Sequence, residues 1–214
     1  MKKILPILLW WLVLSILWGI FRLFDSTEII FELIAKPIIW LGITALFLKI
    51  KVIPKNVLSD LKNFYLTKKP ILKIVVLPII AITFYFILIN FRQLSFIQFK
   101  FTLSTIYLLI SSIIINFSTA IVEETIYRGI MYIWLLRKTN EVIAFILVQV
   151  LFLLGHLPIL LLTSNSVSDT LIRSFFILLL GSIHTGIFRL NKSLYSSILS
   201  HGVWNTLIAV LLLS

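Results

Sequence analysis

The chain has 214 residues, a formal net charge of +11 and no cysteine; 60% of its residues are hydrophobic and 13% are charged. A soluble domain carries about 25% charged residues, so the composition excludes an ordinary soluble protein. The lack of cysteine excludes disulfides and thiolate metal sites. The cations lie in short joints between apolar runs, which indicates membrane topology signals and attraction to anionic lipid head groups, so we expect no nucleic-acid partner.

Apolar runs of about 20 residues recur along the chain, and each could cross a bilayer as a helix. We therefore predict an all-α polytopic membrane protein of about seven spans (about six to eight), forming one domain over 1–214. The first run follows Lys2 and Lys3, but it is too long for a signal-peptide core and lacks a cleavage site before Asp25, so we expect it to be retained. The predicted spans are 4–24, 29–48, 71–91, 102–136, 142–162, 171–189 and 194–213.

The charges of the joints predict an orientation. The joint between the second and third spans is strongly basic, which indicates the cytoplasmic side under the positive-inside rule. The joint after the first span contains Asp25, Glu28 and Glu32, and the joint at 163–170 contains Asp169, which suits the outer side. We predict a multi-pass protein of the cell membrane with its N-terminus in the cytoplasm and its C-terminus outside. The lysines of the basic joint are Lys49, Lys51, Lys55, Lys62, Lys68, Lys69 and Lys73.

Three ionisable residues, Glu123, Glu124 and Arg128, lie inside the fourth predicted span. An ionisable residue costs roughly 2.5–3.5 kcal/mol at a helix centre on insertion scales, so it indicates function. Glu124 and Arg128 share one helix face and could form an ion pair, whereas Glu123 lies about 140° from Arg128 around the helix. Two adjacent acids, of which only one meets the arginine, should not titrate alike, so we predict Glu123 as a general base. A solvated helix end is the alternative interpretation.

Three more polar residues occupy the fifth and seventh spans. His156 follows Phe152 by one helical turn, so that the phenyl ring could pack against the imidazole. His201 and Asn205 share a helix face, and both can donate hydrogen bonds to a developing oxyanion. Each could instead serve interhelical hydrogen bonding, worth about 0.6 kcal/mol on average. A single pocket shared with the carboxylates gives His156, His201 and Asn205 the lowest free-energy cost of burial in lipid. This predicts an active site within the membrane. We interpret His184 as structural or interfacial.

Three motifs follow one another in the order Glu123-Glu124-x-x-x-Arg128, Phe152-x-x-x-His156 and His201-x-x-x-Asn205. Their order and spacing resemble the CPBP intramembrane proteases. That family, also called the Abi family, includes CAAX prenyl endopeptidases and bacteriocin-processing or self-immunity proteins. The resemblance covers about 118–210, which we expect to be a catalytic core, whereas 1–100 carries no family signature and is expected to hold variable N-terminal spans.

The resemblance implies a helical membrane endopeptidase. In that reading, Glu123 and His156 activate a water molecule for attack on a peptide carbonyl. His201 and Asn205 stabilise the oxyanion that this attack produces. The residues implied to hold the local geometry are Glu124 and Arg128.

The resemblance does not decide whether a metal ion takes part in catalysis. Members of the family have been described both as metallopeptidases and as glutamate-dependent enzymes. Glu123, His156 and His201 could ligate zinc or another divalent metal by residue type. The chain contains no His-Glu-x-x-His element, and spacing alone does not decide between the two. We favour a water molecule activated by glutamate.

The composition, rich in isoleucine, leucine and lysine, is typical of a low-GC bacterium, in which prenylated substrates are not expected. We therefore predict a bacterial peptide or membrane protein as the substrate, in peptide maturation or bacteriocin self-immunity. One alternative is a non-catalytic membrane immunity or binding protein on the same fold. A less favoured alternative is a proton-coupled transporter that uses the same residues as a relay. The cleavage site and the oligomeric state are left open.

Overall fold

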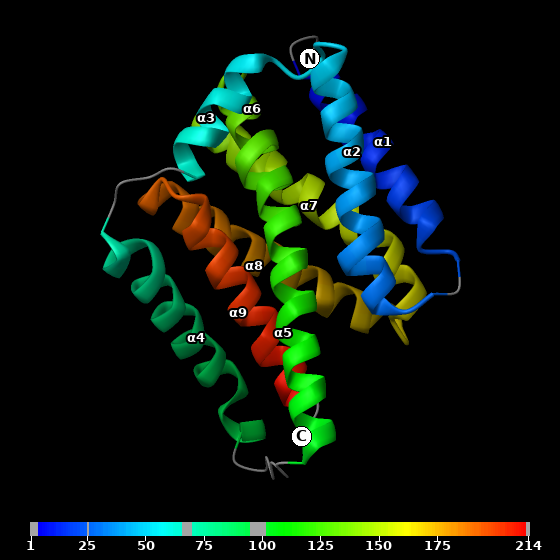
Figure 1. Cartoon of the computed structure of the whole chain (residues 1–214), viewed down its shortest axis with the longest axis vertical. Coiled ribbons are helices and arrows are strands. Elements are labelled where there is room, and N and C mark those ends of the chain that lie inside the picture. The colour runs from blue at the N-terminus through cyan, green and yellow to red at the C-terminus, as the bar shows by residue number, and fades with distance from the viewer. Residues whose placement is uncertain (1–3, 25, 66–69, 95–101, 213–214) are drawn as a thin grey trace.

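A computed structural model describes residues 4–24, 26–65, 70–94 and 102–212. These residues form a bundle of helices in which the first and last described residues lie toward opposite ends of the long axis (Figure 1). The predicted all-α fold is confirmed. The elements are α1 (Leu5–Phe21), the π-helical segment η1 (Ile30–Ala35), α2 (Lys36–Lys49), α3 (Lys55–Tyr65), η2 (Leu72–Val76), α4 (Leu77–Leu94), α5 (Leu103–Glu124), η3 (Thr125–Tyr132), α6 (Ile133–Leu136), α7 (Glu141–Thr163), α8 (Val167–Asn191) and α9 (Leu194–Leu212).

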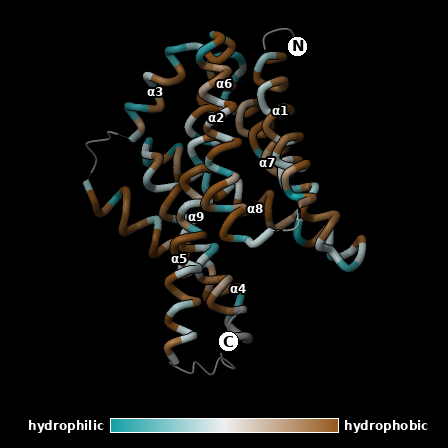
Figure 2. Tube along the Cα trace, turned by 45° about the vertical axis from the view of Figure 1, so that its right-hand side comes forward, coloured by the Kyte–Doolittle hydropathy of each residue, from teal (hydrophilic) through white to brown (hydrophobic). Residues whose placement is uncertain are grey.

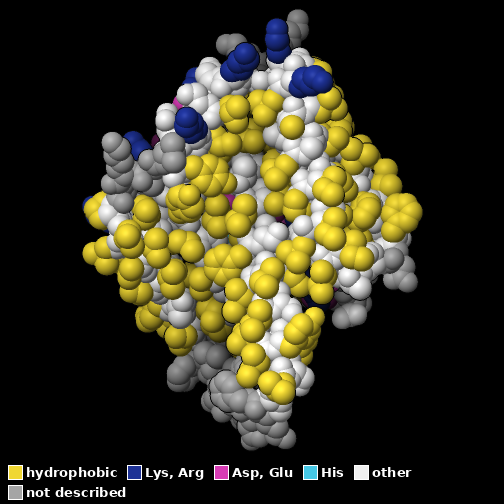
Figure 3. All heavy atoms as spheres, in the orientation of Figure 1, with side chains coloured by type: hydrophobic (Ala, Val, Ile, Leu, Met, Phe, Trp, Pro, Cys, Tyr) yellow, Lys and Arg dark blue, Asp and Glu magenta, His cyan; other side chains and the backbone are white. Residues whose placement is uncertain are grey.

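The long helices have the length and composition of membrane spans. Within the described residues, six helices are long and apolar enough to cross a bilayer, and Leu5–Phe21 is a shorter apolar helix. Hydrophobic side chains cover most of the face seen in Figure 3, as expected of a surface that meets lipid. The chain is therefore a multi-pass membrane protein. The six spans are Ile30–Lys49, Leu72–Asn90, Leu103–Leu136, Glu141–Thr163, Val167–Asn191 and Leu194–Leu211.

The basic joint after the second span contains helix α3, which we did not predict. Its Val57 and Leu61 are one turn apart and buried, while Lys55 and Lys62 face outward, so the helix is amphipathic. It is more hydrophilic than the spans (Figure 2), and lysine and arginine side chains gather at its end of the molecule (Figure 3). Its side of the membrane stays a prediction. Part of that prediction lies outside the described residues, namely Lys2, Lys3, Asp25, Lys68 and Lys69.

Side-chain caps define where the central helices begin. Thr102 accepts a hydrogen bond from the Thr105 backbone N–H at 3.1 Å, and Asn140 accepts one from that of Ile143 at 2.9 Å. These caps satisfy backbone donors that have no partner within the first turn. At the C-terminal end of α8, Lys192 adopts a left-handed conformation with φ of 47°, and α9 begins two residues later. The caps and this turn position α5, α7, α8 and α9 around the interior.

Two clusters of apolar side chains hold the bundle together. The larger joins α1, α2, α3, η3, α6 and α7, and includes Trp10 and Trp134 with ring centroids 6.2 Å apart. The smaller joins α4 to α9 through Ile82, Phe86 and Trp204. Helix α4 therefore packs chiefly against α9, whereas α9 also packs closely against α5.

The close approach of α5 and α9 depends on Gly202. A Cβ at this position would lie 2.8–3.0 Å from three ring atoms of Phe117. We expect Gly202→Val to lower the stability by about 1–3 kcal/mol, because overpacking forces the two helices apart. Gly186→Val on α8 is the control, since a Cβ there meets no atom within 4 Å. Thermal unfolding in detergent measures both, and equal midpoints would contradict the packing argument.

Candidate functional site

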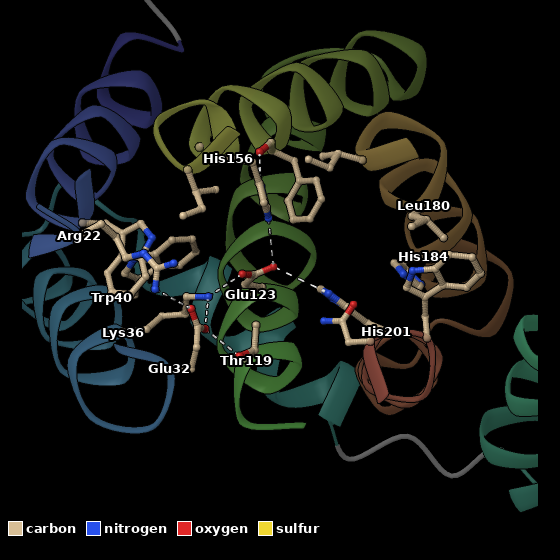
Figure 4. A pocket seen from close by; sticks show the side chains of 17 residues that line it. Arg22, Glu32, Lys36, Trp40, Thr119, Glu123, His156, Leu180, His184 and His201 are labelled. Atoms are coloured by element: carbon tan, nitrogen blue, oxygen red, sulfur yellow. Dashed lines mark hydrogen bonds and ion pairs between the residues drawn. The ribbon is translucent and has the colours of Figure 1, made fainter. Parts of the chain in front are cut away.

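A cavity of about 350 Å³ opens among the helices of the bundle, and four of the six residues predicted for the site line it (Figure 4). Glu123 comes from α5, His156 from α7, and His201 and Asn205 from α9. The sequence separates these residues by as many as 82 positions, and the bundle brings them together. The proposed single pocket is thus present among the described residues.

Glu123 lies between the two histidines and is 4% exposed. Its Oε2 is 3.9 Å from Nε2 of His156 and 3.9 Å from Nε2 of His201. Both separations are too long for a direct hydrogen bond, and a polar separation of this size suits a bridging water molecule. The carboxylate and both imidazoles therefore face one small volume in which a water molecule can contact all three.

The hydrogen bonds behind the histidines define their tautomers. Nδ1 of His156 lies 2.8 Å from the carbonyl oxygen of Phe152, and Nδ1 of His201 lies 2.7 Å from Oε1 of Glu124. A carbonyl and a carboxylate accept hydrogen bonds, so each Nδ1 carries the hydrogen. In the neutral rings each Nε2 therefore presents a lone pair toward Glu123. The Phe152 ring also packs on the His156 imidazole at 4.5 Å between centroids, as predicted.

Glu124 points away from this volume and pairs with Arg128. Arg128 Nη1 donates to Glu124 Oε1 at 2.9 Å, and both side chains are fully buried. The same oxygen accepts from His201. Arg128 also donates from Nη2 to the carbonyl oxygen of Gly181 at 2.8 Å and from Nε to Thr185 Oγ1 at 3.1 Å. The expected ion pair is confirmed, and it ties the carboxylate of α5 to both α8 and α9.

Asn205 lines the cavity one helical turn after His201 on α9. Its side-chain amide has two N–H donors and one carbonyl acceptor. An amide at this position can donate toward a group bound beside Glu123. The geometry of Asn205 is thus compatible with the role that the family resemblance implies.

His184 lies at the wall of the cavity and is 1% exposed, so the interfacial interpretation is wrong, whereas the structural one stays a prediction. Its ring stacks on that of His201 with centroids 4.9 Å apart and planes 12° apart, and its Nδ1 lies 2.9 Å from Ser200 Oγ. His184 lies seven residues before Asn191 at the end of α8, and His201 lies seven residues after Leu194 at the start of α9. The two histidines therefore reach the same depth in an antiparallel pair of helices, a signal that the sequence contains.

Lys36 and Glu32 also line the cavity, and the sequence argument missed both. Lys36 Nζ donates to Glu123 Oε1 at 2.8 Å and pairs with Glu32 Oε2. Glu32 had been assigned to an outer joint with Glu28, but it belongs to η1 and accepts a hydrogen bond from Thr119 Oγ1 at 2.7 Å. The sequence does contain a signal for these two residues, because a lysine lies four residues after a glutamate within a predicted apolar span.

The donor atoms around the cavity include the types that zinc accepts, and a histidine whose Nδ1 is bonded to a carboxylate is a common metal ligand. Among the described residues, however, no group of three or more His, Asp or Glu side chains is arranged to hold a metal ion. The Lys36 ammonium already occupies the other oxygen of Glu123 at 2.8 Å. The residues as arranged do not fit a metal centre.

Comparison with known proteins gives the same assignment as the motifs. Residues 104–207 match the family model described as type II CAAX prenyl endopeptidase Rce1-like, and this segment runs from α5 into α9. No curated protein and no solved structure matches the chain. The matched segment contains every residue of the three motifs. Residues 104–207 therefore match the CAAX-type endopeptidase family that the three motifs resemble.

Proposed function

We propose that this chain is an endopeptidase that hydrolyses peptide bonds inside the membrane with a water molecule activated by Glu123. The observation that carries the proposal is the position of Glu123 Oε2, at 3.9 Å from both imidazole Nε2 atoms. A water molecule bridging these atoms has an oxygen acceptor and two nitrogen acceptors for its two hydrogens. General-base catalysis requires a base within hydrogen-bond reach of the proton that it removes, directly or through one water molecule.

The reaction then follows from the positions of these groups. Glu123 Oε2 takes a proton from the water as the water oxygen bonds to the peptide carbonyl carbon, and the carbonyl π electrons move to oxygen. Collapse of the tetrahedral intermediate breaks the C–N bond, and the proton held by Glu123 passes to the leaving nitrogen. His156 Nε2 accepts the second hydrogen bond of the water and keeps a lone pair of its oxygen directed at the carbonyl.

Oxyanion stabilisation is assigned to Asn205 and His201. The Asn205 amide can donate in its ordinary state. Neutral His201 cannot donate from Nε2, because its hydrogen is on Nδ1, bonded to Glu124. A protonated His201 could donate, and the Glu124 carboxylate would stabilise that positive ring as the aspartate of a serine-protease triad does. Asn205 is thus the constant donor, and His201 becomes one only on gaining a proton.

The substrate is proposed to be a peptide or a membrane protein of a bacterial cell, cut during peptide maturation or self-immunity. The family description names prenyl endopeptidases, so a prenylated peptide is the comparison substrate. The cavity is lined by Trp18, Trp40 and Trp204, which can cover apolar parts of either substrate. The composition of the chain favours the bacterial peptide.

Replacing Glu123 by glutamine should abolish cleavage. Glutamine keeps the shape of the side chain but cannot accept the proton, and general-base catalysis contributes typically about 10²–10⁴-fold. Membranes carrying wild type, Glu123→Gln and His156→Ala are compared by mass spectrometry of resident peptides and protein termini. Cleavage products should be present with wild type and absent with both variants.

Glu141→Gln is the matched control for this experiment. Glu141 is an exposed acid that pairs with Arg189 at the surface of the bundle, so the same change there should leave the profile of cleavage products unaltered. Identical profiles for wild type and Glu123→Gln, with both proteins folded and equally abundant, would remove the protease proposal and favour a binding or immunity protein.

Exhaustive treatment with a metal chelator should leave the cleavage rate unchanged. A divalent cation at Glu123 Oε2 would be repelled by the Lys36 ammonium, which lies 2.8 Å from the other oxygen of the same carboxylate. The rate of appearance of the Glu123-dependent products is measured before and after dialysis against 1,10-phenanthroline. Loss of cleavage that added zinc restores would instead assign Glu123, His156 and His201 as metal ligands.

A further inference from the structure

We propose that Lys36 is a positioning residue of the catalytic carboxylate, because its ammonium holds Glu123 Oε1 and thereby directs Oε2 toward the two histidines. This inference rests on the function proposed above. Lys36 comes from α2 and lies outside the matched segment 104–207. The site therefore includes a part supplied by the N-terminal helices.

The contacts of Lys36 form a closed ring between two helices (Figure 4). Its Nζ donates to Glu123 Oε1 at 2.8 Å and pairs with Glu32 Oε2. Glu32 Oε2 in turn accepts from Thr119 Oγ1 at 2.7 Å. Thr119 lies one turn before Glu123 on α5. The ring thus begins and ends on α5, and it restrains the glutamate side chain through partners on η1 and α2.

Burial makes this ammonium a rigid partner. Lys36 is 4% exposed, and its Nζ lies 5.2 Å from the ring centroid of Trp18 and 5.7 Å from that of Trp40. Two carboxylates and two indole faces therefore surround the charge, which removes the rotational freedom that a surface lysine keeps. A lysine held in this way can restrain the rotamer of Glu123.

The two carboxylate oxygens of Glu123 have different partners, which supports a positioning role for Lys36 over a role in substrate binding. Oε1 of Glu123 is bonded to Lys36, whereas Oε2 faces Nε2 of both histidines at 3.9 Å. Without the ammonium, the carboxylate could turn and present either oxygen, or neither, to the water. Catalytic geometry tolerates misplacements of only about 0.5 Å before the rate falls. Lys36 should therefore affect turnover and leave substrate affinity unchanged.

The test compares kcat and KM of purified wild type, Lys36→Met, Lys36→Arg and Glu123→Gln in detergent. The probe is a synthetic quenched peptide spanning a cut that requires Glu123 in the membrane profile. Lys36→Met should lower kcat by about 10- to 100-fold, because a misplacement of about 1 Å can cost roughly 10²-fold, with KM within about twofold. Lys36→Arg keeps the charge and should recover part of kcat.

Thr44→Val is the control for helix packing. Thr44 is buried on the same helix two turns after Lys36, and its hydroxyl donates to the Trp40 carbonyl oxygen at 2.6 Å outside the cavity. This variant should keep the wild-type kcat. If Lys36→Met fails to fold, Glu32→Gln replaces it, since it leaves Lys36 in place but removes the charge of one of its two carboxylate partners, and it should lower kcat several-fold.

The outcomes separate the two proposals. A wild-type kcat for folded Lys36→Met, or for Glu32→Gln when Lys36→Met does not fold, overturns the positioning role. So does a rise in KM at constant kcat, which would assign Lys36 to substrate binding. If Glu123→Gln cleaves the peptide like wild type, the proposed function itself fails, whatever the Lys36 variants do.

Discussion

Pairing of buried charges is the constraint on which the interior of this protein depends. Glu124 is paired with Arg128, and Glu123 with Lys36. Breaking a buried ion pair leaves an uncompensated charge and costs about 3–5 kcal/mol in soluble proteins. Lys36 of α2 reaches Glu123 of α5, and Arg128 also donates to Gly181 and Thr185 of α8, so the helices can pack only in arrangements that satisfy both carboxylates. The same ion pairs therefore determine both the packing of the bundle and the geometry of the cavity.

Two neighbouring acids in one helix acquire different surroundings because the helix turns between them. Glu124 faces α8 and α9, and its Oε1 accepts hydrogen bonds from Arg128 of η3 and from His201 of α9. Glu123 faces α2 and the cavity, and keeps one oxygen free of direct hydrogen bonds to the histidines. Adjacent residues of one chemical type thus serve separate purposes, one joining helices and the other exposed to a bound water molecule. The π-helical turn η3 begins directly after them, a feature common at functional sites.

Structural features that depend on residues close together in the chain could be predicted from the sequence. Hydropathy located the spans, and one-turn spacing predicted the Glu124–Arg128 pair and the packing of Phe152 on His156. Tertiary contacts could not be predicted in this way. Lys36 lies in an apolar run, and only the bundle shows that Glu123 is its partner. The π-helical segments depend on packing, and hydropathy gives no sign of them.

The number of residues in and around the short turn between α8 and α9 determines which side chains meet at the cavity. His184 and His201 stack because each lies seven residues from its own end of that turn. A single residue inserted between Leu194 and His201 would rotate the following side chains by about 100° and shift them by about 1.5 Å. His201 would then lose both its stacking partner and Glu124. Homologous chains that keep this stack and the Glu124 bond should therefore conserve the number of residues between the two histidines, even where the residues of the turn itself differ.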